Sequence, residues 1–385
     1  MILALIALLG QEPADDSPAK ALTRFVSGLS GLSGKDPTPL ARTIVDSLEL
    51  PETLNSVLDG VLRAESGWRF LRDLEIEFKY FDEKDGTQGF GVACSYVKDL
   101  KSFDLVRGTT VRGMAFAVRA EGNVAFDQET NPRDFLDFRV AFRFFQSSGG
   151  VVREGTTDAE KDELFKLEEE LVNIKTRDEL KKSPAWTRFS SLIQDRLTTQ
   201  IFFDASIEAG VESDQSFTRE QYVIGARVAL DIKAWNAKSP EASFNVFDYP
   251  CALIRQLTGC DSGFRVRGST MPTLIIGLDS IHPRDDDPRT LAGDDSDFLR
   301  LRVEASFRSP IARFEGATLF FDVNARYYLE LGASDVVRAA DLDHFSYVSL
   351  ALASSQGVYV SYAAGRMPLD ARDDVIYEAG LKVNF

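Results

Sequence analysis

A histidine and a serine stand two residues apart near the end of the chain. The sequence has only two histidines, and one of them, His344, precedes Ser346 by two positions. An imidazole beside a hydroxyl can act as general base for a serine nucleophile. On a strand, this spacing puts both side chains on one face, together with the apolar residues Val348, Leu350 and Leu352. No acid or amide that would orient the imidazole is obvious, so coincidence is our preferred interpretation of the pair.

A second group of chemically capable residues is an acidic stretch with hard oxygen ligands suited to Ca²⁺. It contains Asp285, Asp286, Asp287, Asp294, Asp295 and Asp297. Their spacing is not that of an EF-hand loop, so a solvated acidic surface loop is preferred. The sequence also lacks a phosphate-binding loop, zinc-ligand spacing and a hydrolase elbow. We therefore predict no metal site and no cofactor.

The largest charged set alternates with apolar residues along many segments. In a membrane barrel, such mixed-sign residues would line the lumen and set the selectivity of a water-filled pore. They could equally form salt bridges that fill a closed interior, and the sequence leaves both readings open. The predicted pore-lining residues are Glu75, Glu77, Arg119, Asp137, Arg139, Arg143, Asp204, Glu208, Arg227, Asp231, Arg300, Arg302, Glu304, Asp322 and Arg326, with Glu121 and Glu330 on the same face.

The elements that position these charges are strands, because apolar and charged residues alternate with period two. The clearest example has Leu299, Leu301 and Val303 against Arg300 and Arg302. A soluble sandwich with its polar face outward would give the same alternation. The strands approach the ~9–11 residues needed to cross a bilayer, which favours the membrane arrangement. We predict an all-β fold, a transmembrane antiparallel barrel of about 12 strands within residues 70–385.

The final strand, Val375 to Phe385, alternates in the same way and ends the chain on an aromatic residue. It resembles the C-terminal signal of bacterial outer-membrane β-barrels, in which a polar residue, a glycine and alternating apolar positions precede a final Phe. The matching positions are Glu378, Gly380, Val383 and Phe385. The resemblance implies a porin-like barrel in the bacterial outer membrane, with outer-membrane lipids and the barrel assembly machinery as partners. It also implies that the final strand closes on the first and that Phe385 lies on the periplasmic side.

The His-x-Ser pair carries a second resemblance, to outer-membrane lipid hydrolases of the phospholipase A and lipid A deacylase types. There the His is the base and the Ser the nucleophile, which would give His344 and Ser346 those roles. In those families an Asn usually follows the Ser, whereas Tyr347 follows it here.

Several segments do not fit the strand pattern. Residues 1–16 contain the apolar run Ile2 to Leu9 and look like a secretory signal. The residue pattern predicts a helical periplasmic segment over residues 17–69 and a helical insert over residues 146–199. It predicts an irregular connector over residues 236–272, with a short helix from Tyr249 to Thr258. All of them fall on the expected periplasmic side, where they would form a cap or plug and could bind a periplasmic protein.

Composition narrows the function further. A net charge of -16 argues against nucleic-acid binding, which needs clustered basic residues. No run of ~20 apolar residues is present, as a transmembrane helix would require. Of the three cysteines, only Cys251 and Cys260 could pair, and a straight helix between them would prevent it. The preferred function is a porin-like channel for small solutes without catalytic residues. The alternatives are the lipid hydrolase and a closed structural barrel that binds periplasmic partners.

Overall fold

Strands account for most of the computed structural model. It describes residues 74–384 except 85, 108–109, 127–133, 237, 285–286, 315–316 and 371–373, and only scattered residues within 151–196. The predicted signal and N-terminal helical segment lie outside the described residues. The twelve described strands are β1 (Leu74–Glu83), β2 (Gln88–Arg107), β3 (Thr110–Ala125), β4 (Leu136–Ser148), β5 (Gln200–Ser213), β6 (Glu220–Lys233), β7 (Thr273–Pro283), β8 (Phe298–Phe314), β9 (Ala317–Leu331), β10 (His344–Ser354), β11 (Val358–Gly365) and β12 (Asp374–Asn384).

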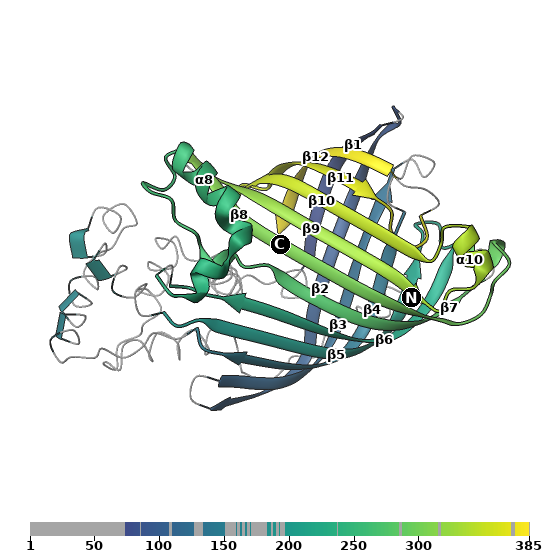
Figure 1. Ribbon diagram of the computed structural model, residues 1–385, viewed down its shortest axis with the longest axis horizontal. Coiled ribbons are helices and arrows are strands. Elements are labelled where there is room, and N and C mark those ends of the chain that lie inside the picture. Colours follow the sequence, from purple (N-terminus) through teal and green to yellow (C-terminus); the bar gives the residue numbers. More distant parts are fainter. Residues whose placement is uncertain are drawn as a thin grey trace.

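The strands form one closed antiparallel barrel in which each strand pairs with its sequence neighbours (Figure 1). The ring closes where β1 pairs with β12, with Phe78 opposite Leu381 and Lys79 opposite Gly380. Closure pairs every sheet edge. A lipid environment requires this, because hydrocarbon cannot hydrogen-bond to backbone groups. The predicted fold class, strand number and closure of the last strand on the first are confirmed.

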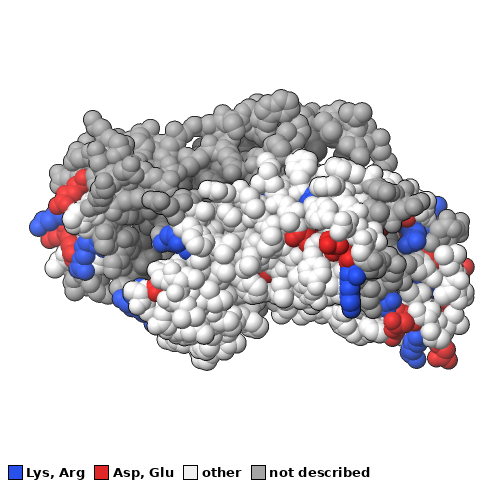
Figure 2. Space-filling view, turned by 90° about the horizontal axis from the view of Figure 1, so that it is seen from above, with Lys and Arg blue, Asp and Glu red and all other residues white. Residues whose placement is uncertain are grey.

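The alternation in the sequence sorts side chains between the two faces of the wall. On β4, Phe138, Phe142 and Phe144 are exposed on the outside, whereas Asp137 and Arg139 are buried on the inside. The same inversion recurs around the barrel, which is the opposite of a soluble sandwich. In Figure 2 the visible described wall is dominated by uncharged residues, with charged side chains gathered mainly toward the ends.

The two ends of the barrel carry different connectors. The termini end is where β1 begins and β12 ends, and it carries the connectors β2–β3, β4–β5, β6–β7, β8–β9 and β10–β11. The loop end carries the remaining connectors, with the short helices α9 (Pro288–Leu291) and α10 (Asp335–Ala339). At the termini end, the β6–β7 connector contains η2 (Glu241–Phe244), η3 (Val246–Asp248), α8 (Tyr249–Leu257) and η4 (Gly268–Thr270).

The predicted short helix is present as α8. In the β4–β5 insert, described residues such as 162–163 and 184–185 have helical backbone, and Arg188 pairs with Glu163 at 2.7 Å. None of the described helices has the length and apolarity to cross a membrane.

Two strand pairs contain irregularities at the termini end. The register shifts between Asp99 and Lys101 in β2 and between Pro310 and Ala312 in β8. Proline lacks the N–H that the ladder would use, so a shift at Pro310 is the expected accommodation. The β2–β3 hairpin is also longer than the sequence pattern predicted, because β2 runs for 20 residues.

Candidate functional site: the barrel lumen

The barrel interior holds all of the predicted pore-lining residues. They lie on the face opposite the exposed apolar rows, and none of them is exposed. Interior chains such as Arg139, Glu212 and Asp279 are almost completely buried. The exposure of the inner side chains varies along the barrel axis, and those in the loop-end half are the more deeply buried.

Arg139 of β4 lies at the centre of the tightly filled half. Its guanidinium contacts the Asp137 carboxylate at 2.8 Å and the Glu212 carboxylate at 2.5 Å. It also lies 3.4 Å from both Glu208 and Asp279. Four acidic groups thus surround one cation, and Asp279 reaches it from β7, three strands away around the ring.

Two arginines of β8 extend this network. The Arg300 guanidinium donates to Glu212 at 2.6 Å and to Asp279 at 3.2 Å. Arg302 donates to Glu208 at 3.3 Å. Glu208 and Glu212 belong to β5. The pairs that Arg300 and Arg302 make with them therefore join strands three positions apart in the ring. The network, defined by Arg139, Glu208, Glu212, Asp279, Arg300 and Arg302, is called the ion-pair septum below.

One ion pair crosses the full width of the lumen. Arg326 of β9 donates from Nη1 to Glu121 Oε1 of β3 at 2.7 Å. These strands are six positions apart in either direction around the ring, so they lie on opposite walls. Arg119 of β3 also donates to Glu121, at 3.0 Å. Twelve strands make a wider barrel than the ~8 whose interiors side chains readily fill, so spanning this lumen takes long side chains.

Beyond these charges, apolar residues cap the loop end. Phe135, from the β3–β4 connector, and Met367 and Leu369, from the β11–β12 connector, pack on the inward-facing Tyr328 and Tyr347. The backbone oxygen of Leu369 also accepts a hydrogen bond from Arg219 of the β5–β6 connector at 3.1 Å. This apolar cap and the ion-pair septum together close the loop-end half in the structure.

The termini-end half is more open. Arg308 of β8 pairs with Asp322 of β9 at 3.3 Å, yet these side chains are 34% and 29% exposed. Lys382 pairs with Glu75 and Glu77, and all three are also partly exposed. Ser306, on the same inner row as Arg308, is exposed as well. This termini-end half of the interior, with its partly exposed side chains, is called the vestibule below.

The arrangement of polar and apolar groups decides the class of protein. Every described wall strand is paired on both sides, and along most of the wall large apolar residues face outward while most charged residues are enclosed. Such a surface is stable only in contact with hydrocarbon, and even-numbered closed antiparallel barrels of this kind belong to bacterial outer membranes. The protein is an outer-membrane β-barrel. Outer-membrane lipids are therefore its partners around the wall.

Comparisons with known proteins give matches only among solved structures, and these are of low similarity. No family model matches the chain, and no curated protein matches it. Among solved structures, it is similar to the KdgM porin (7% identity, 81% of this chain and 99% of that chain, TM-score 0.26). It is similar also to the NanC porin (7%, 81% and 99%, 0.32) and to outer membrane phospholipase A from Escherichia coli (8%, 81% and 89%, 0.28). At these TM-scores the assignment rests on the barrel's own architecture.

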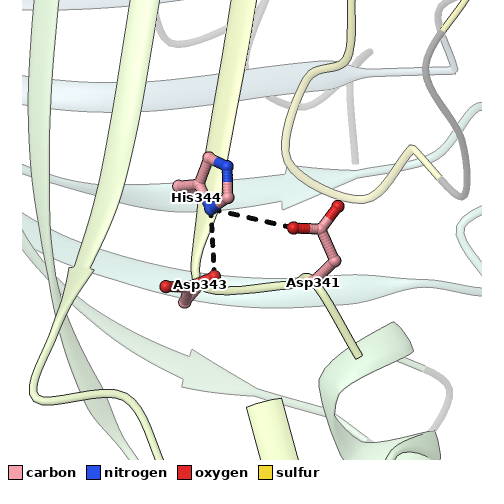
Figure 3. A group of neighbouring side chains, drawn as sticks. All are labelled: Asp341, Asp343 and His344. Atoms are coloured by element: carbon pink, nitrogen blue, oxygen red, sulfur yellow. Dashed lines mark hydrogen bonds and ion pairs between the residues drawn. The ribbon is translucent and has the colours of Figure 1, made fainter. Parts of the chain in front are cut away.

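His344 and Ser346 are exposed on the outer face of β10 at the loop end. Figure 3 shows His344 with Asp343 and Asp341. His344 Nδ1 is 3.0 Å from Asp343 Oδ1 and 3.9 Å from Asp341 Oδ1. Asp343, which was not obvious as an orienting acid from the sequence, is therefore in contact with His344. The hydrogen bond with His344 lowers the pKa of Asp343. Among the described hydrogen bonds, none joins Ser346 Oγ to His344.

Three carboxylates of the acidic stretch, those of Asp287, Asp294 and Asp297, make contacts within the protein. Asp287 accepts from the backbone N–H of Arg289 and caps α9. Asp294 accepts from Ser296 and Ser334, and Asp297 lies 2.5 Å from His282. Asp285 and Asp286 lie outside the described residues. The carboxylates that are described hold loops together.

The predicted assembly-signal positions lie on β12, apart from Phe385, which is outside the described residues. Glu378 faces inward and pairs with Lys79 of β1 at 3.0 Å. A Cβ at Gly380 would collide with the backbone of Phe78 and lie 2.9 Å from the Tyr359 ring, so only glycine fits there. Cys94, Cys251 and Cys260 are all free thiols.

Proposed function

We propose that this protein is a narrow channel for small charged solutes whose lumen is closed at rest. The observation that carries the proposal is the ion pair between Arg326 and Glu121, which joins opposite walls beside the ion-pair septum. Apart from the apolar cap, the described inner face of the barrel is lined mainly with charged side chains.

The chemistry of the interior favours a channel over a purely structural barrel. Buried ion pairs stabilise a fold no better than apolar residues of similar volume. A barrel that served only as an anchor would be at least as stable with an apolar interior. Charged side chains, in contrast, can exchange their partners for water and passing ions. The apolar cap belongs partly to connectors, and connectors open more readily than sheet.

The test is single-channel conductance of the refolded protein in a planar bilayer. The wild type should open rarely, with ion-selective current steps. The double variant Glu121→Gln/Arg326→Gln should be open for a larger fraction of time, because it removes the pair that crosses the lumen. Arg308→Gln/Asp322→Asn is the matched control, since it removes an ion pair between adjacent strands in the vestibule.

The outcomes separate the alternatives. If the control pair raises the open fraction as strongly as the cross-lumen pair, the septum is not the gate. If wild type and variants all fold, insert and remain silent, the channel proposal fails and a closed structural barrel takes its place. Reversing the charge at Glu304 should shift ion selectivity in any variant that conducts.

A lipid hydrolase is a second candidate, favoured by the contact between Asp343 and His344 on the outer wall. In this proposal Asp343 orients the imidazole, and a modest side-chain rotation brings Ser346 Oγ to it. The test is phospholipid ester hydrolysis in detergent. Ser346→Ala should abolish it, and Ser349→Ala, on the inner face of the same strand, should leave it intact. Absence of wild-type hydrolysis would eliminate this candidate.

Orientation and partners belong to the same proposal. We place the termini end in the periplasm, with β12 read by the barrel assembly machinery and the 146–199 insert available to a periplasmic protein. Added protease should then cleave the β7–β8 connector in intact cells and leave the insert uncut. The reverse pattern of cleavage would overturn this orientation.

A further inference from the structure

The β6–β7 connector has its polarity reversed relative to a helix on a soluble protein. Its buried positions are mostly small or polar, and they include Asn245, Asp248, Cys251, Ala252 and Arg255. Most of its large apolar side chains are exposed, with polar residues such as Glu241 and Gln256 exposed among them. The exposed Phe244, Phe247, Leu253, Ile254 and Leu257 are called the connector face below, and two of them, Phe244 and Leu257, are 78% exposed. A surface helix normally turns its apolar stripe toward the protein.

Contacts from the buried side hold this connector against the barrel wall. Arg255 is fully buried and donates to the Asp248 carboxylate, to Ser309 Oγ at 2.9 Å and to the Pro310 carbonyl oxygen at 3.0 Å. Asn245 adds a hydrogen bond to the carbonyl oxygen of Arg267 at 2.7 Å. These polar groups are thus paired within the protein, and among the described residues none covers the connector face.

The position of Ser309 shows which side of the wall the connector occupies. Ser309 is in regular register opposite Phe321, on the outward row that includes Leu301 and Val303. Thr258 Oγ1 donates to the Ile311 carbonyl oxygen at 2.9 Å, which extends the contact along β8. Helix α8 therefore lies on the outside of the barrel at the termini end (Figure 1). The connector face continues the lipid-facing surface of the wall.

We propose that the connector face is a lipid-binding element that lies in the headgroup boundary of the leaflet at the termini end. An amphipathic helix at this level buries its apolar side among the first acyl carbons. Tyr249, half-exposed beside the connector face, suits the interface, where tyrosine is enriched. Arg265 is exposed on the same connector and can meet phosphate headgroups. Continuity with the lipid-facing wall favours lipid over a soluble protein or a second copy of the chain.

The experiment uses tryptophan fluorescence of the full-length protein in phosphatidylcholine vesicles with and without brominated acyl chains. Leu257→Trp places a probe on the connector face, at one of its most exposed positions. Gln356→Trp is the matched control, since Gln356 is exposed in the β10–β11 turn at the same end of the barrel. With the wild-type signal subtracted, bromolipid should quench the Leu257→Trp emission about twofold and leave Gln356→Trp nearly unchanged. Bromine near the headgroup end should quench more than bromine near the chain terminus.

Three results would overturn the proposal. Quenching of Leu257→Trp by aqueous acrylamide and not by bromolipid would show that the face is in water, available to a soluble partner. Bromolipid quenching that disappears as the protein-to-lipid ratio rises would point to a second copy on the face. Equal quenching at both positions would show no specific contact. Phe247→Trp supplies an independent probe if Leu257→Trp does not fold.

Discussion

Asp294 joins two connectors at the loop end. Its carboxylate accepts from Ser296 Oγ at 2.6 Å and from Ser334 Oγ, on the β9–β10 connector, at 2.6 Å. These hydrogen bonds hold the pKa of Asp294 at about 2, below the ordinary value of about 3.9. Because the folded pKa is lowered, the link contributes fully above pH ~3.9 and is lost as pH falls through about 2.

Ser334→Ala should raise the pKa of Asp294 toward its ordinary value, because it removes one of the donors that favour the ionised form. The measurement is an NMR titration of the Asp294 carboxyl carbon in detergent micelles. Ser355→Ala, in a turn at the opposite end, is the control and should leave the titration unchanged. An unshifted pKa in Ser334→Ala would show that the two connectors are not joined through this contact.

Individual residues also show where sequence reasoning stops. Parity along each strand placed Glu121 and Arg326 on the inner face, as observed. It gave no sign that they meet, because they are 205 positions apart and the contact depends on barrel width. Asp343 was overlooked for a different reason. Neighbouring strand residues point to opposite faces, but Asp343 precedes the first residue of β10 and its side chain can turn back to His344.

The pair of strands that closes the barrel depends on a buried contact. Lys79 of β1 donates to Glu378 of β12 at 3.0 Å, and Ser361 of β11 donates to the other carboxylate oxygen at 3.0 Å. Lys79→Met removes the cationic partner of the Glu378 carboxylate in a buried setting. The expected loss of stability is about 3–5 kcal/mol, because one partner of a buried pair is removed. Urea unfolding in lipid vesicles measures it.

The double variant Lys79→Met/Glu378→Gln is the matched comparison for this closure. It removes both charges, so its stability should recover a large part of the loss caused by Lys79→Met alone. Equal losses in the single and double variants would mean that the pair does not couple β1 to β12. The outcome bears on assembly as well, since Glu378 lies within the predicted assembly signal.

The strands and α8 were accessible from sequence because each depends on local periodicity. Alternating apolar and charged residues in the sequence correspond to the two faces of a wall strand. This pattern predicted about twelve strands, with errors at their ends that were largest in the β2–β3 hairpin. The placement of α8 was not accessible. Its apolar side would pack inward on a soluble protein, and only the contact between Arg255 and Ser309 shows that it lies on the outside of the wall.

The molecule as a whole is asymmetric along the barrel axis. Inner side chains of the vestibule are partly exposed, whereas those of the ion-pair septum and the apolar cap are buried. Two serines on the inner face sample these halves with the same chemistry. Ser306 of β8 is exposed in the vestibule, and Ser206 of β5 is buried and donates to Glu208 of the septum at 2.8 Å.

A water-soluble thiol reagent applied to the refolded barrel should therefore distinguish Ser306→Cys from Ser206→Cys. In a background without the three native thiols, Ser306→Cys should react at least about tenfold faster, since thiol reactivity follows solvent access. Adding Glu121→Gln/Arg326→Gln should accelerate Ser206→Cys and leave Ser306→Cys nearly unchanged, because only the former is shielded by contacts across the lumen. Equal rates in the two single variants would show that water reaches both halves, and the lumen would then be an open pore without a septum.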